Sequence, residues 1–185
     1  ADTEAMVKQV VDTYGRLDCA FNNAGIEGDF QPIPDYPEAT WDRVIGINLT
    51  GVWLSMKAEI NQMLSQGGGT IVNTASVAGL QGMPAASAYS AAKHGVVGLT
   101  KRAALEYAKA GIRVNAVCPG GTETPMLKRA FEKVPGMKEG IGAAEPVGRL
   151  AQPSEIGEAV AWLCSDAASF VTGHPMAVDG GFVAQ

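Results

Sequence analysis

A chain of 185 residues, 46% hydrophobic and 18% charged, has the length of one domain and enough apolar material for a full core. Its net charge of −5, without a basic cluster, disfavours nucleic-acid binding, because phosphate contacts need gathered lysines and arginines. No apolar run approaches the ~20 residues of a membrane span, and two histidines with three cysteines offer no zinc-ligand spacing.

The first half of the chain alternates helix and strand. Apolar residues at helical spacing predict a helix over residues 2–14, which Gly15 ends. A strand follows over 17–21, and a proline-rich irregular loop occupies 27–38. Thr40 is then expected to cap a long helix that reaches about residue 64.

The second half repeats this alternation. A β-branched strand over 70–75 and a loop lead into a helix over 87–110, and the next strand spans 112–117. Residues 122–151 form the longest irregular stretch, before a helix over 153–163 and a last strand over 175–178. Alternating strands and helices predict right-handed parallel crossovers and a doubly wound α/β sheet.

The cysteines point to a reducing compartment. Cys19, Cys118 and Cys164 each lie in an apolar run, so we expect small buried thiols in a cytoplasmic protein and no disulfide framework.

Tyr89 and Lys93 form the most informative pair. Four residues apart on a predicted helix, they share one helical face. An ammonium beside a phenol favours the phenolate, so we expect Lys93 to lower the pKa of Tyr89 from its usual value near ~10. This pair therefore predicts a general acid and base for alcohol–carbonyl interconversion.

Other polar signals accompany this pair at strand ends. Ser76 ends the predicted strand over 70–75, and the carboxyl edge of such a sheet is where open α/β folds bind ligands. Asn22-Asn23-Ala24-Gly25 closes an earlier apolar run, and the segment from Asn115 to Pro119-Gly120 closes a later one.

Together these residues resemble the short-chain dehydrogenase/reductase family over essentially the whole chain. The matching motifs occur in the family's order and spacing: Asn22–Gly25, Asn48-Leu49-Thr50-Gly51, Ser76, Tyr89 with Lys93, and Pro119-Gly120 with Thr124. The resemblance implies one domain over 1–185 with a Rossmann-like, three-layer α/β/α fold. Its strands would be the family's fourth to seventh, which are adjacent.

The resemblance also implies the chemistry. Tyr89 would exchange a proton with the substrate oxygen, and Ser76 would hydrogen-bond that oxygen. Lys93 would bind the nicotinamide ribose hydroxyls, and Asn48 would kink its helix and hold a water that links Lys93 to solvent. The implied activity is hydride transfer between NAD or NADP and a small-molecule secondary alcohol or ketone.

Cofactor contacts follow from the same resemblance. Asn22, Asn23, Ala24 and Gly25 would let the backbone approach the adenosine-side ribose. Pro119, Gly120, Thr122 and Thr124 would hold the nicotinamide carboxamide. Within 122–151, residues from Met126 to Gly148 resemble the family's substrate lid, with a short amphipathic helix whose apolar positions are Met126, Leu127, Phe131, Val134 and Met137.

Each assignment has a structural alternative. Tyr89 could pack between alanines, Lys93 and Asn48 could face solvent, and Ser76 could satisfy a strand end. The family usually forms homotetramers, built through the two long helices and the C-terminal elements. We expect a homotetramer or homodimer here, and a gel-filtration mass of one subunit would contradict that.

One feature departs from the family pattern. A family member begins with a strand and a Thr-Gly-x-x-x-Gly-x-Gly turn, whereas this sequence begins with a predicted helix. We expect a longer parent protein in which about sixty further residues bind the cofactor phosphates. The alternatives are a catalytically silent fragment or binding module, and an epimerase or dehydratase that retains its nicotinamide.

Overall fold

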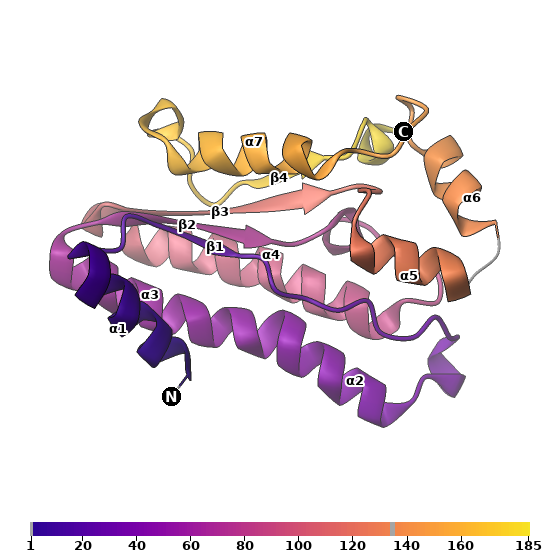
Figure 1. Cartoon of the computed structure of the whole chain (residues 1–185), viewed down its shortest axis with the longest axis horizontal. Coiled ribbons are helices and arrows are strands. Elements are labelled where there is room, and N and C mark those ends of the chain that lie inside the picture. Colours follow the sequence, from indigo (N-terminus) through magenta and orange to yellow (C-terminus); the bar gives the residue numbers. More distant parts are fainter. Residues whose placement is uncertain (1, 134–135) are drawn as a thin grey trace.

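Four parallel strands form one sheet in the order β1-β2-β3-β4 (Figure 1). The computed structural model describes residues 2–133 and 136–185. The strands are β1 (Cys19–Asn22), β2 (Gly69–Thr74), β3 (Ile112–Pro119) and β4 (Pro175–Val178). Strands that are adjacent in sequence are adjacent in the sheet, as predicted, and their carboxyl ends therefore meet at one edge.

Helices cover both faces of this sheet and make three layers. On one face lie α1 (Asp2–Tyr14), α3 (Gly51–Gln66) and α4 (Ser87–Tyr107), and on the other lies α7 (Pro153–Cys164) (Figure 1). Each face of the sheet has its own hydrophobic core. Ile71 packs in the core shared with α1, α3 and α4, Val72 packs in the core shared with α7, and both are fully buried. Because Ile71 and Val72 point to opposite faces of the sheet and both are buried, β2 is covered on both sides, as a central parallel strand is. The doubly wound fold is confirmed.

The helix predicted over 40–64 is interrupted. It begins as α2 (Glu38–Ile45), after Pro37, and passes through a π-helical segment (Gly46–Thr50) into α3. Thr40 does not cap it; the Thr40 hydroxyl donates instead to Asp29, at 2.8 Å. A π segment widens the helix by one residue per turn and often marks a functional site, and apolar periodicity does not reveal it.

The stretch predicted as irregular contains two helices, α5 (Pro125–Lys133) and α6 (Met137–Ala144). The amphipathic helix expected near residue 126 is confirmed as α5, whereas Val134 lies outside the described residues. An isolated parallel bridge between Thr122 and Ala151 closes the base of this segment, which we call the lid.

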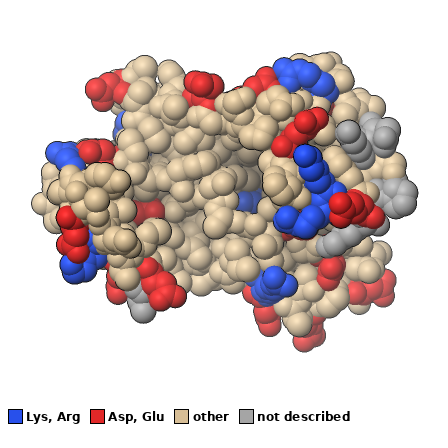
Figure 2. Space-filling view, in the orientation of Figure 1, with Lys and Arg blue, Asp and Glu red and all other residues tan. Residues whose placement is uncertain are grey.

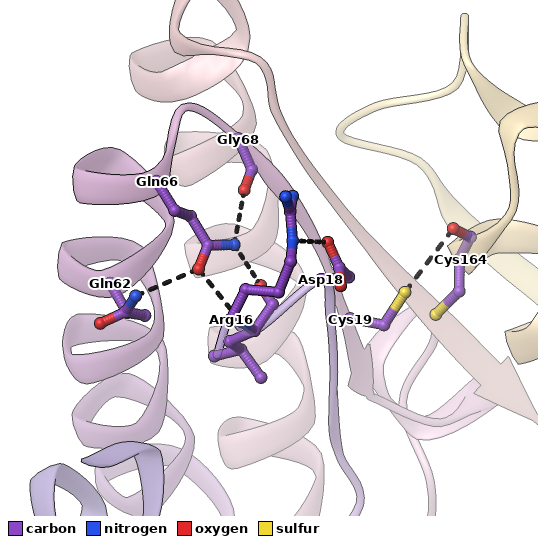
Figure 3. Close-up of polar contacts among 8 residues, drawn as sticks. Arg16, Asp18, Cys19, Gln62, Gln66, Gly68 and Cys164 are labelled. Carbon is purple, nitrogen blue, oxygen red and sulfur yellow. Dashed lines mark hydrogen bonds and ion pairs between the residues drawn. The ribbon is translucent and has the colours of Figure 1, made fainter. Parts of the chain in front are cut away.

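The amino edge of the sheet is held by side chains shown in Figure 3. Gln66, at the end of α3, accepts the Leu17 N–H at 3.0 Å and donates to the Leu17 and Gly68 carbonyls. Cys19 was predicted to be buried but is exposed. Its side chain points away from α3 and toward the end of α7, where its Sγ donates to the Cys164 carbonyl at 3.7 Å (Figure 3).

Within residues 2–133 and 136–185, no helix combines the length and the apolar character that a membrane crossing needs.

Candidate active site

Three of the predicted catalytic residues meet at the carboxyl edge of the sheet. Ser76 follows β2, while Tyr89 and Lys93 lie in the first two turns of α4. The Lys93 Nζ lies 5.5 Å from the centre of the Tyr89 ring, and the Ser76 side chain hydrogen-bonds the Tyr89 phenol. Gly79 allows the loop after β2 to lie close to the α4 main chain, because a Cβ on Gly79 would lie 2.7 Å from the Lys93 carbonyl oxygen.

Tyr89 differs electrostatically from the expectation. Burial of its phenol raises the pKa, the hydrogen bond with Ser76 lowers it, and the negative charge of Glu27 raises it again; the net shift is upward. The lowered pKa expected from the Lys93 spacing is therefore wrong for this structure. Desolvation of the phenol is the largest of these effects.

Lys93 is buried, with 3% of its surface exposed, and its Nζ donates to the Thr74 carbonyl at 2.7 Å. Burial lowers the pKa of Lys93 to about 8, while Cys118 acts in the opposite direction. The ammonium therefore remains largely protonated at neutral pH. The alternative of a solvated surface lysine is wrong.

Asn48 lies inside the π segment and is fully buried. Its Oδ1 accepts the Ile26 N–H at 2.9 Å, and its Nδ2 donates to the Ile26 carbonyl at 2.8 Å. A Cβ on Gly25 would lie 3.2 Å from this Oδ1 and 3.8 Å from the Lys93 Nζ. Asn48 thus holds the loop after β1 close to Lys93 and does not face solvent.

The two asparagines at the end of β1 have different surroundings. The Asn22 Nδ2 donates to Glu59 and to Asn73, so this side chain points into the α3 layer and away from the sheet edge. The Asn23 Oδ1 accepts from the Thr74 hydroxyl at 3.0 Å and joins two strand ends. Asn22 therefore positions the loop through the core.

Glu59 was missed by the sequence reasoning. This α3 carboxyl is only 2% exposed and accepts from Asn22 at 3.0 Å, while Asn73 donates onward to Thr100 of α4. Burial raises the pKa of Glu59 from 4.5 to about 7, although the bond from Asn22 lowers it. A glutamate among the apolar positions Met56, Ile60 and Met63 was the available signal.

Glu59→Gln is expected to remove a pH dependence of stability. Because the folded-state pKa is raised, Glu59 favours the folded state while protonated and loses that contribution as pH rises from 4.5 through about 7. Between pH 5 and pH 9 the variant should gain about 3 kcal/mol of unfolding free energy relative to the parent. Denaturant unfolding at both pH values measures this, with exposed Glu158→Gln as control. Parallel pH curves for parent and Glu59→Gln would contradict it.

The loop after β3 completes the edge. The Gly120 N–H donates to the Val178 carbonyl at 3.1 Å, and the Thr122 hydroxyl donates to the Gly120 carbonyl at 3.1 Å. The Thr124 Oγ1 accepts the Leu127 N–H at 3.3 Å and caps the start of α5. The two threonines thus shape the junction between β3 and the lid.

These contacts fit a nicotinamide cofactor. Gly25 leaves a cradle that a side chain would fill, and buried Lys93 offers further N–H donors beside it. Figure 2 shows the face hollowed near the strand ends, with charged side chains gathered at its border over α5 and few in its middle.

Comparison with known proteins identifies the family. The family model described as enoyl-(acyl carrier protein) reductase matches residues 1–183. The chain is 49% identical over 184 residues to a cyclohexanol dehydrogenase of Acinetobacter sp. (strain SE19), covering 100% of this chain and 71% of that protein. It belongs to the short-chain dehydrogenase/reductase family.

Two further family members are similar along the chain. A 2,5-dichloro-2,5-cyclohexadiene-1,4-diol dehydrogenase of Sphingobium indicum is 47% identical over 184 residues, which are 99% of this chain and 74% of that protein. The crystal structure of levodione reductase has a TM-score of 0.95 at 42% identity, covering 98% of this chain and 72% of that one.

Solved structures of this family also include cofactor complexes. An NAD⁺-bound xylitol dehydrogenase has a TM-score of 0.91 at 38% identity, covering 97% of this chain and 74% of that one. The structure of ElxO with NADP bound has a TM-score of 0.93 at 32% identity, covering 99% of this chain and 74% of that one.

Proposed function

We propose that this protein is an NAD(P)-dependent oxidoreductase that interconverts a secondary alcohol and its ketone, and that the alcohol lies on a six-membered carbon ring. The observation that carries the proposal is the meeting of Tyr89, Ser76 and Lys93 at the carboxyl edge of the sheet. The ring is supported by the names of two relatives, which act on cyclohexanol and on a cyclohexadienediol. The largely uncharged hollow in Figure 2 also suits a neutral alcohol.

The bound nicotinamide supplies the hydride chemistry. Ser76 donates a hydrogen bond to the substrate oxygen and stabilises the negative charge that develops there during reduction. Tyr89 donates its proton to the same oxygen. Because its pKa is raised, the phenol stays protonated at neutral pH and suits this acid role. In oxidation the same groups work in reverse, and Tyr89 accepts the alcohol proton.

Lys93 supports this proton transfer. Its ammonium stabilises a phenolate formed on Tyr89, and its remaining N–H groups are available to ribose hydroxyls. We propose that Asn48 keeps a path from Lys93 to solvent open by holding the Gly25–Ile26 main chain in place. A proton lost from Tyr89 is then replaced through Lys93.

The cofactor would lie along the sheet edge between two loops. Main chain at Ala24 and Gly25 would approach the adenosine-side ribose. Pro119, Gly120, Thr122 and Thr124 would hold the nicotinamide carboxamide, with the lid above it.

Self-association is also proposed. Trp53 and Leu54 of α3 are large apolar residues with 48% and 41% of their surface exposed, and Leu105 of α4 is 81% exposed. They support pairing through the two long helices, and a light-scattering mass of one subunit would contradict it.

Purified protein mixed with cyclohexanol and either NAD⁺ or NADP⁺ should produce reduced cofactor, seen by its absorbance. Tryptophan fluorescence of Trp41, Trp53 and Trp162 should also respond to one cofactor. Absence of both signals would favour a silent binding module. Cofactor binding without net reduction by any cyclic or linear secondary alcohol would favour an epimerase or dehydratase.

A further inference from the structure

A buried carboxyl joins the lid to the loop after β3. Glu145 follows α6 and is only 4% exposed. Its Oε1 accepts the Gly121 N–H at 2.7 Å. Its Oε2 is buried and has no hydrogen-bond partner among the residues that the structure describes. The proposed proton-transfer steps do not use this side chain.

The loop is shaped to receive this carboxyl. A Cβ on Gly120 would lie 2.6 Å from the Glu145 Oε1 and 2.9 Å from the Asp179 Cα. A Cβ on Gly121 would lie 2.4 Å from Ile141, which belongs to α6 of the lid. Two successive glycines therefore permit a close approach between the loop main chain, the lid and the end of β4.

The carbonyl of Gly121 is also held by the lid segment. It accepts the Ala151 N–H at 2.8 Å, and the Glu145 carbonyl accepts the Gly148 N–H at 2.7 Å. Both peptide groups of Gly121 are thus bonded to residues between Glu145 and Ala151. Movement of this lid segment must move Gly121 unless its bonds to Glu145 and Ala151 break.

The surroundings of Glu145 raise the pKa of its carboxyl. Asp179, which follows β4, accepts the N–H groups of Gly181 and Val183, and the ion-paired Arg149 and Glu155 line the same small pocket. Burial raises the pKa of Glu145, the bond from Gly121 lowers it, and Asp179 raises it further. A glutamine of the same shape keeps an acceptor oxygen for the Gly121 N–H.

We propose that Glu145 is a positioning residue that fixes the Gly120–Thr122 main chain against the lid, so that placement of the nicotinamide carboxamide and placement of the lid are coupled. The inference rests on the proposed function, because the loop matters only if it holds a nicotinamide. It adds a residue from the lid's end that acts on the cofactor through Gly121.

Hydrogen exchange tests the bond without cofactor or substrate. Glu145→Gln keeps the acceptor oxygen, whereas Glu145→Leu removes it at similar volume. Exchange at the Gly121 amide should rise about tenfold in Glu145→Leu, the equivalent of one lost hydrogen bond, and stay near the parent value in Glu145→Gln. Exposed Glu158→Leu is the matched control. Unchanged exchange in Glu145→Leu would overturn the proposal, whatever the activity.

Steady-state kinetics then test the consequence. Glu145→Leu should raise the KM for the cofactor about tenfold with kcat within about twofold, and Glu145→Gln should restore KM. An equal rise in the KM for the cofactor in Glu145→Leu and Glu145→Gln would overturn the positioning role. If Glu145→Leu does not fold, Glu145→Asp, which withdraws the carboxyl by one methylene, should raise exchange and KM, and parent-like values would overturn the proposal. Inactivity of the parent itself would count only against the proposed function.

Discussion

Tyr89→Phe is expected to lower kcat by about two to four orders of magnitude, the usual contribution of a positioned general acid or base. The substitution removes only the hydroxyl, which is the group that the Ser76 side chain hydrogen-bonds. The ring would still pack beside Lys93, so the fold and the cofactor site should survive. The Kd for NADH or NADPH, from tryptophan fluorescence, should therefore stay within about threefold, a difference below 1 kcal/mol.

A matched control lies on the same helix. Tyr107, at the far end of α4, packs partly buried against the core, and Tyr107→Phe should leave kcat within about twofold because it lies away from the catalytic edge. If Tyr89→Phe reduced turnover no more than Tyr107→Phe does, the proton would have another donor.

Asn48→Ala is expected to lower the free energy of unfolding by about 2–4 kcal/mol, because it leaves both main-chain groups of Ile26 without their partner. Turnover should fall as well, since Asn48 holds the Gly25 loop against Lys93. Denaturant unfolding measures the first effect. Initial rates measured at a temperature where the variant stays folded separate the second from it.

The control for this prediction is Asn61→Ala on α3, where the asparagine is exposed. It should change stability by less than about 0.5 kcal/mol. A stability loss in Asn48→Ala no larger than the control's would show that the buried bonds to Ile26 contribute little. Full activity in a destabilised Asn48→Ala would remove Asn48 from the proposed proton path.

The sequence was sufficient for the parts of the fold that depend on short-range patterns. Apolar periodicity and glycine stops located the four strands and the helix that carries Tyr89 and Lys93, because each pattern is completed within one element. The carboxyl-edge position of Ser76 followed from the order of strand and loop. These are the features that define the candidate site.

The features that were missed depend on contacts between distant segments. The resemblance implied a kink at Asn48 but neither the π segment there nor its bonds to the loop at Ile26. The pKa of Tyr89 is set by burial that no spacing reveals. The Asn22 side chain turned inward because Glu59, on another element, accepts its hydrogen bond. Glu145 lay in a stretch that glycines and prolines marked only as irregular.

The most direct test of the proposed reaction follows the hydride itself. Cyclohexanol carrying deuterium on its carbinol carbon is incubated with the protein and the cofactor that binds, and the reduced cofactor is analysed by mass spectrometry. The deuterium should be found in the nicotinamide ring, and the Tyr89→Phe protein should form this product far more slowly. Reduced cofactor without the label, or no reduced cofactor from a protein that binds it, would contradict hydride transfer from the alcohol.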